Sequence, residues 1–203
     1  MKARITKEMI AEAGFTIVRK EGEAKLSVRN VAAKLGCSTQ PVMYWFKTTE
    51  ELRASVLERA NGFHTAYLMR LSPDDADIMI GIGMNYIHFA ADERNLFRFI
   101  VMSDKAQNTG LAELISSEDA GGMLVPFQQR YGLTPDQARD VFEALFVCFH
   151  GYAALVAYGA LHYDAVRFRR QLVRICSSVT EDIKMARAKR VYTSGEDAVP
   201  LHF

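Results

Sequence analysis

The stretch from residue 26 to residue 52, LSVRNVAAKLGCSTQPVMYWFKTTEEL, constrains the fold of this chain more than any other. Apolar residues recur at helical spacing over residues 28–35. Gly36 follows them, at the point where a helix-ending residue adopts a left-handed conformation that glycine tolerates best. After the turn, Ser38 is a candidate N-cap for a second short helix over residues 39–45. The pattern therefore predicts two short helices joined by a tight glycine turn.

Two short helices joined in this way form a helix-turn-helix unit, whose second helix has the right size for a DNA major groove. The motif LSVRNVAAKLG, the turn after it, and an aromatic cluster that ends at Phe46 before the helix start TTEEL resemble the DNA-binding domain of the TetR family of transcriptional regulators. The resemblance implies an N-terminal three-helix DNA-binding domain followed by a larger helical bundle.

We assign residues 1–49 to the helix-turn-helix domain and residues 50–203 to a helical domain for effector binding and dimerisation. A helix over about residues 49–68 has its apolar residues on one connected face, and both domains share it as a connector. No change in composition marks a flexible linker, so we expect rigid coupling through this helix.

The rest of the chain is also predicted to be helical, because no segment alternates as a β-strand does. The chain reads as all-α, with about nine helices. Gly121-Gly122 is expected to break the chain before a helix that starts at Met123. The remaining helices are expected over residues 6–20, 74–91, 95–102, 134–160 and 164–190, with a loose tail from residue 192.

Charge is distributed unevenly along the chain. Residues 1–49 carry nine Lys and Arg against four Asp and Glu, whereas residues 71–203 carry 13 against 17. A basic head on a mildly acidic body suits a phosphate-bearing partner at the head. The first helix is expected to pack across the two short helices, and it could also place Lys2, Arg4 or Lys7 near a phosphate.

The compartment is inferred from the cysteines and from the apolar segments. Cys37, Cys148 and Cys176 are odd in number and lack CxxC spacing, which favours a reducing compartment. The N-terminus lacks the apolar core of a signal peptide. Residues 144–161 are apolar except for His150 and approach transmembrane length, but they are rich in Ala and Gly and suit a buried or interface helix. We expect a cytoplasmic protein without a membrane span.

The sequence contains no HExxH, GxSxG or Gly-rich phosphate loop. His88, His150 and His162 are too scattered along the chain to propose a metal site. We therefore expect a protein that is not an enzyme and that uses neither a cofactor nor a metal.

Residue chemistry and the family resemblance together assign DNA contacts in the helix-turn-helix. Arg29 has the reach for a phosphate or for guanine O6 and N7, and Gln40 can pair with adenine N6 and N7. Ser27 is either a simple N-cap or a phosphate ligand. Tyr44 and Trp45 can reach a phosphate, although a core position for one of them fits the pattern equally well. The expected DNA-binding residues are Ser27, Arg29, Ser38, Thr39, Gln40, Tyr44, Trp45 and Lys47.

Two positions depart from the family pattern. Met43 stands where the family usually has Tyr, so that expected phosphate contact is absent. Thr49 stands where a Lys is common, and Lys47 could replace that Lys. The operator sequence therefore cannot be inferred by analogy.

In the resembled family the last two long helices of each subunit form a four-helix dimer interface. Here small residues on the first of these helices allow close approach, and an apolar stripe runs along the second. A twofold dimer would hold two recognition helices roughly 34–36 Å apart on a near-palindromic site. The expected interface residues are Gly151, Ala154, Tyr158, Leu161, Phe168, Leu172, Ile175 and Val179.

Family members commonly bind a small molecule among the middle helices, and this region is rich in Met and aromatic residues. A mainly apolar pocket with His88 or His150 as a polar group would suit a hydrophobic or aromatic ligand. Each of these residues could equally belong to the core. The candidate ligand-binding residues are Phe63, Tyr67, Met84, His88, Phe97, Met102, Phe149 and His150.

These observations lead us to expect a homodimeric transcriptional regulator of the repressor type, which binds double-stranded DNA and is released by a small molecule. The sign of regulation follows from the family resemblance alone. The alternative is a helical dimeric interaction protein without DNA-binding activity, which would leave no footprint on DNA.

Overall fold

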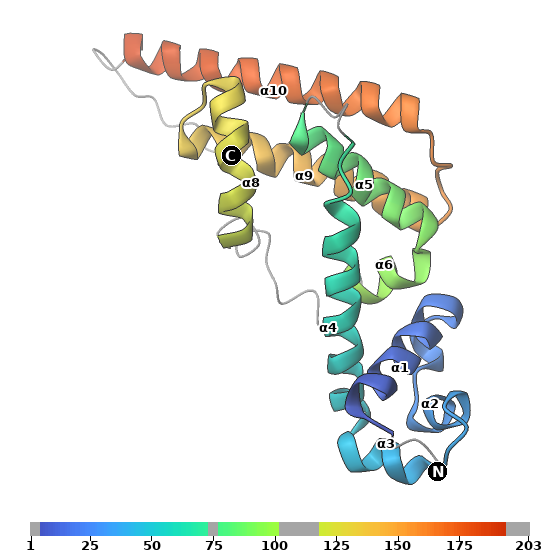
Figure 1. Ribbon diagram of the computed structural model, residues 1–203. Helices are drawn as coiled ribbons and strands as arrows, with labels where there is room; N and C mark the ends of the chain where they lie inside the picture. The colour runs from blue at the N-terminus through green and yellow to red at the C-terminus, as the bar shows by residue number, and fades with distance from the viewer. Residues whose placement is uncertain (1–4, 73–76, 102–117, 194–203) are drawn as a thin grey trace, which may run out of the picture. The chain divides into compact units, whose positions relative to one another are not determined.

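The computed structural model describes residues 5–72, 77–101 and 118–193 (Figure 1). Every regular element in these ranges is a helix, which confirms the predicted all-α fold. The nine α-helices and one short 3-10 helix of the described residues are α1 (Lys7–Glu21), η1 (Glu23–Lys25), α2 (Val28–Lys34), α3 (Thr39–Trp45), α4 (Thr49–Leu68), α5 (Ile78–Asp92), α6 (Arg94–Val101), α8 (Glu118–Tyr131), α9 (Pro135–Ala157) and α10 (Ala165–Thr193).

The chain divides into two compact units. The first comprises Met1–Arg70, Asn85–Thr109 and Ala153–Tyr163, and the second comprises Leu71–Met84, Gly110–Tyr152 and Asp164–Phe203. The division therefore passes through α5 and α9. Residues 1–49 lie wholly in the first unit, and the predicted domain boundary after residue 49 stays a prediction.

The core of the first unit forms where α1 packs on α4. Figure 1 shows α1, α2 and α3 grouped around the N-terminal half of α4. Ile10 and Val18 on α1, and Leu52 and Val56 on α4, are completely buried, and burial of such side chains contributes about 1.5–3 kcal/mol each. The helices approach closely at Gly14, where a Cβ atom would lie only 2.5 Å from Val56 Cγ2. A larger residue at position 14 would therefore require the Val56 side chain or the helices to shift.

Polar contacts hold the C-terminal end of α1 against the junction of α5 and α6. The Arg19 guanidinium donates to both carboxylate oxygens of Glu93, with Nε 2.9 Å from Oε2, and this hydrogen bonding raises the pKa of Arg19. The Asn95 amide donates to the Arg19 carbonyl at 3.1 Å. The guanidinium also lies 5.0 Å from the centre of the Phe63 ring on α4. These contacts join helices of the first unit at one point.

The C-terminal end of α4 is held by a second polar cluster. The Tyr67 hydroxyl donates to Asp92 Oδ2 at 2.9 Å and lies 3.1 Å from Nδ1 of His88. Burial and the bond to Asp92 raise the pKa of Tyr67, so its hydroxyl is a neutral donor at physiological pH. The Asn85 amide donates to the Leu68 carbonyl at 3.0 Å. The last turn of α4 is therefore fixed to α5.

In the second unit, Asp77 caps the first turn of α5. Its Oδ1 accepts from the backbone N–H groups of Met79 and Ile80, at 3.0 and 3.3 Å. Its Oδ2 accepts a hydrogen bond from the Tyr131 hydroxyl and lies 3.6 Å from Nε of Arg130. The start predicted at residue 74 lies outside the described residues, and the cap that the structure describes is Asp77.

Helix α9 contributes several side chains to the core of the second unit, among them Val141, Leu145 and Phe149. The Phe149 ring packs so tightly on α5 that a Cβ atom at Gly83 would lie 3.0 Å from its Cδ1. The ring of Tyr152 packs on that of Phe168 of α10, with centroids 4.8 Å apart. The apolar face predicted for the last two helices therefore packs at least partly within one chain.

The break predicted at Gly121-Gly122 is wrong. Helix α8 runs without interruption from Glu118 to Tyr131, and it therefore also begins before the predicted start at Met123. A glycine costs a helix only about 1 kcal/mol, and burial of Leu124 and Phe127 later in the same helix offsets that cost.

Helix α9 is long and apolar enough to cross a membrane, judged by length and composition alone. Its fully buried residues nevertheless recur every three or four positions, at Ala138, Val141 and Leu145, and the same face continues to Ala153. This period is typical of a helix with one face in a protein core.

His64 on α4 provides a pH-dependent contribution to stability. Its ring lies 4.6 Å from the centre of Phe89 and 5.7 Å from that of Tyr86, and its buried Nε2 has no hydrogen-bond partner among the described residues. Burial lowers the pKa of His64 from 6.5 to about 4. Between pH 6.5 and about pH 4, His64 is therefore neutral in the folded state and protonated in the unfolded chain.

We predict that the free energy of unfolding falls as the pH is lowered from 6.5 to about 4, by up to about 3 kcal/mol from this group alone. His64→Phe should remove that part of the pH dependence, measured by urea denaturation at several pH values. His162→Gln, at an exposed histidine, should leave it unchanged. Equal acid sensitivity of His64→Phe and the wild type would contradict the assignment.

Candidate nucleic-acid interface

Helix α2 is capped and oriented by its own first residues. The Ser27 hydroxyl accepts from the Asn30 backbone N–H at 3.2 Å, so Ser27 is an N-cap, one of the two roles expected of it. The Asn30 amide donates to the Lys25 carbonyl at 2.7 Å. Val31 is completely buried, whereas Arg29 lies on the exposed side of the helix. The guanidinium of Arg29 is therefore accessible beside the capped helix start.

The turn between α2 and α3 depends on Gly36. Its φ of +64° is left-handed, and the backbone N–H groups of Gly36 and Cys37 donate to the carbonyls of Ala33 and Ala32 at 3.1 and 3.0 Å. These bonds satisfy carbonyls that the end of α2 leaves free. The turn is therefore short and defined, and it fixes where α3 begins.

Helix α3 is anchored by its apolar side and presents its polar side to solvent. Val42 is completely buried and Phe46, directly after the helix, is 2% exposed. Ser38, Thr39 and Gln40 are exposed. The hydroxyl of Ser38, although it stands at the N-cap, makes no capping hydrogen bond. The first turn of α3 therefore offers hydroxyl and amide groups to a partner.

The C-terminal end of α3 is aromatic and basic. Tyr44 is 65% exposed and meets Trp45 edge to face, with centroids 5.3 Å apart. The Nζ atom of Lys47 lies 5.6 Å from the centre of the Tyr44 ring. Trp45 is only partly exposed, and its Nε1 donates to the Ile5 carbonyl at 3.2 Å. The single donor of the Trp45 side chain therefore already has a partner within the chain, and a DNA contact of Trp45 stays a prediction.

The candidate ligand-binding residues do not form one set within either unit. Four of them (Phe63, Tyr67, His88 and Phe97) belong to the first unit, three (Met84, Phe149 and His150) belong to the second, and Met102 lies outside the described residues. Phe97 and Phe149 are buried core residues. His150 is half-buried, and burial lowers its pKa, which favours the neutral imidazole.

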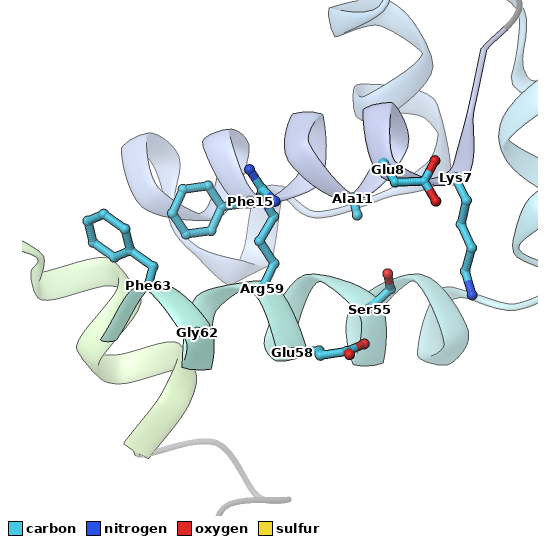
Figure 2. Close-up of a pocket in the computed structure, with 9 residues that line it drawn as sticks. All are labelled: Lys7, Glu8, Ala11, Phe15, Ser55, Glu58, Arg59, Gly62 and Phe63. Carbon is cyan, nitrogen blue, oxygen red and sulfur yellow. The ribbon is translucent and has the colours of Figure 1, made fainter. Parts of the chain in front are cut away.

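The groove between α1 and α4, of about 650 Å³, contains only one of these residues, Phe63 (Figure 2). Figure 2 shows Phe15, Phe63 and Arg59 toward one end of the groove and Lys7 and Glu8 at the other. The Arg59 guanidinium pairs with Glu12 and lies 5.7 Å from the centre of the Phe15 ring. The predicted apolar pocket among the middle helices is thus not the groove found in the first unit.

Two of the residues expected in the dimer interface, Phe168 and Leu172, are buried within the single chain. They are 1% and 0% exposed within the single chain, because they fill the space between α10 and its own neighbours. An apolar stripe at helical spacing does not tell an internal contact from a subunit contact. Of the other expected residues, Gly151 and Tyr158 are exposed, and those that are half-buried are Ala154, Leu161, Ile175 and Val179.

The sequence analysis did not predict several contacts that organise this region. The bond from Trp45 to Ile5 joins positions 40 apart, and the bonds of Arg19 to Glu93 and Asn95 to Arg19 join positions more than 70 apart. No local pattern reports contacts of this kind. The closest available signal was the cluster of basic residues around Lys7.

Comparisons with known proteins support the fold. No family model matches the sequence, and no curated protein matches it. A member of the TetR family, SCO1917 from Streptomyces coelicolor A3, shares the fold with a TM-score of 0.58 and 22% identity, over 83% of this chain and 96% of that one. The multidrug binding protein EbrR, in a complex with imidazole, gives a TM-score of 0.56 and 22% identity, over 83% of this chain and 88% of its own. The chain therefore has the TetR-like fold that the sequence predicts.

Two glycines of the first unit should respond in opposite ways to alanine. At both Gly36 and Gly62 an added Cβ atom would meet nothing within 4 Å, but only Gly36 has a positive φ. We predict that Gly36→Ala lowers the free energy of unfolding by about 1 kcal/mol, because a left-handed alanine is strained, whereas Gly62→Ala raises it by about 0.5–1 kcal/mol within α4. Denaturant titration measures both, and Gly36→Asn should lose less than Gly36→Ala. Equal stability of Gly36→Ala and wild type would contradict the left-handed turn.

Proposed function

We propose that this chain, which has the fold of a TetR-family protein, is a homodimeric DNA-binding transcriptional regulator of the cytoplasm and acts as a repressor. The observation that carries the proposal is the orientation of α3. Val42 of α3 and Phe46 directly after it are buried, while Thr39, Gln40 and Tyr44 are exposed. A helix held in this way can enter a major groove without rearranging its own core.

The exposed groups of α2 and α3 suit two kinds of contact with duplex DNA. Gln40 can make two hydrogen bonds to adenine, and Thr39 can contact a thymine methyl group or a base edge through its hydroxyl. Arg29 can bind guanine or a phosphate. We assign Ser27, Ser38, Lys47 and the hydroxyl of Tyr44 to the sugar-phosphate backbone, because hydroxyl and ammonium donors there add affinity without reading the sequence.

The partner of the second half of the chain is proposed to be another copy of itself. Exposed residues, apolar apart from a glycine, follow one face of α9 at steps of four, at Val147, Gly151 and Leu155, and the exposed Tyr158 stands directly after the helix. On α10, Val166 and Val173 are 77% and 46% exposed and stand seven residues apart. An apolar stripe of this length on a monomer marks an interaction surface. A twofold dimer through it would favour a near-palindromic operator.

Regulation by a small molecule is proposed to act through α4. This helix packs on α1 in its first half and is fixed to His88 and Asp92 of α5 at Tyr67 in its last turn. A ligand that shifts one end of a rigid helix moves whatever is packed on the other end. EbrR, with the same fold, is described as a multidrug binding protein complexed with imidazole, which supports a small hydrophobic or aromatic effector here.

The first test is selection of bound fragments from random duplex DNA, followed by affinity measurements for the enriched site. We predict a near-palindromic site, with affinity reduced about fivefold to 100-fold by Arg29→Ala and by Gln40→Ala, in line with about 1–3 kcal/mol for a base contact. Lys20→Ala, which removes an exposed charge near the far end of α1, is the matched control and should bind normally. Absence of any enriched site would favour the alternative, a helical dimeric interaction protein without DNA binding.

The second test concerns the dimer. Val147→Glu and Val173→Glu should each shift the protein toward monomer in sedimentation velocity experiments, because a buried carboxylate without a partner costs several kcal/mol. Met69→Glu places the same charge on an exposed methionine after α4 and should leave the assembly unchanged. A dimer that survives both of the first two substitutions would contradict the proposed interface.

A further inference from the structure

The start of α1 is fastened to the end of α3 by one hydrogen bond. The indole Nε1 of Trp45, the last residue of α3, donates to the carbonyl of Ile5 at 3.2 Å. Thr6 follows as the N-cap of α1 and accepts from the Met9 backbone N–H at 3.2 Å. Lys7 is the first residue of α1. This bond therefore ties the chain two residues before Lys7 to the end of the proposed recognition helix.

Two lysines surround the aromatic end of α3. Lys7 Nζ lies 5.6 Å from the centre of the Phe46 ring, and Lys47 Nζ lies 5.6 Å from the centre of the Tyr44 ring. An aromatic ring attracts an ammonium group through its electron-rich face and uses none of the hydrogen-bond donors of that group. Because Phe46 is buried and fixed, it holds the Lys7 ammonium near one place while the N–H groups of that ammonium remain available to an anion.

We propose that Lys7 binds a backbone phosphate of the operator beside α3, and that Trp45 is the positioning residue that holds Lys7 there. This inference rests on the proposed DNA-binding function and adds to it a phosphate contact from outside the helix-turn-helix. Trp45 then acts on DNA only through Lys7, since its one N–H donor is occupied by Ile5.

The charges around Lys7 are compatible with a phosphate partner. The adjacent carboxylate, Glu8, is drawn toward the start of α1, where hydrogen bonds from its own backbone and from Thr6 lower its pKa. It therefore faces donors at the helix start, where negative charge is favoured. Lys2 and Arg4 lie outside the described residues and have no part in the proposal.

The experiment measures operator affinity as a function of salt for the full chain, using the fragment enriched by selection. Loss of one phosphate contact lowers the magnitude of the slope of log K against log salt by about 0.9. Lys7→Ala should therefore lower the slope of the dimer by about 1.8 and weaken binding about tenfold near physiological salt. Lys7→Arg should keep the slope, and Lys20→Ala, on the same helix, should keep both slope and affinity.

The Trp45→Phe variant keeps a ring against Tyr44 and loses the N–H donor to Ile5. We expect it to weaken binding in the same direction as Lys7→Ala, with a lower salt slope. The double variant Trp45→Phe, Lys7→Ala should bind no more weakly than Lys7→Ala, because Trp45 has nothing left to position. Thermal melting and circular dichroism show whether each variant is folded under the conditions of the assay.

Three results would overturn the inference. An unchanged salt slope for Lys7→Ala would show that Lys7 does not neutralise a phosphate, and this arm is independent of whether Trp45→Phe folds. Additive losses from the two substitutions would show that Trp45 acts on DNA by another route. Absence of salt-dependent DNA binding in the wild type would remove the proposed function as well, whereas the first two results would leave it intact.

Discussion

The close approach of α1 and α4 at Gly14 is the contact on which the first unit depends. A Cβ atom at this position would meet Val56 Cγ2 at 2.5 Å and Leu26 Cδ1 at 3.2 Å. Three segments therefore converge on a residue without a side chain, namely α1, α4 and the segment that leads into α2. Interior packing at this density leaves no room for an added methyl group unless the neighbouring side chains or the helices shift. Because α2 and α3 are built on this support, their orientation follows from it.

The consequence for the exposed face of α3 is preorganisation. Val42 and Phe46 fix the helix from below, the Gly36 turn fixes its start, and the bond from Trp45 to Ile5 fixes its end. Binding of a partner to Gln40 or Tyr44 therefore requires little ordering of the α3 backbone, which keeps the entropic cost of binding small. The same rigidity allows α4 to act as one lever, since its first half supports this region and its last turn is held by Tyr67.

Much of the fold was predictable because its signals are local. Helical spacing, hydroxyl caps and a glycine turn lie within a few residues of one another, and the predicted limits of α3 and α4 agree with the structure. Contacts between distant residues were not predictable in the same way. An apolar stripe on α10 looked the same whether Phe168 faced its own chain or a second one, and the structure buries it within its own chain. The Trp45 N–H could have pointed to solvent, but its partner proved to be a carbonyl 40 residues away.

The sequence by itself determined the all-α class, most of the helices, the caps at Thr6 and Ser27, the basic head and the polar start of α3, because each of these depends on neighbouring residues and on side-chain chemistry. Only the tertiary structure decided which side chains remained available. It buried Phe168 and Leu172, occupied the indole of Trp45, and divided the candidate ligand-binding residues between two units. The physical reason is that a side chain can bury its apolar surface, or pair its one donor, against any segment that folding brings near. The residue spacing within a single helix does not specify which distant segment that is.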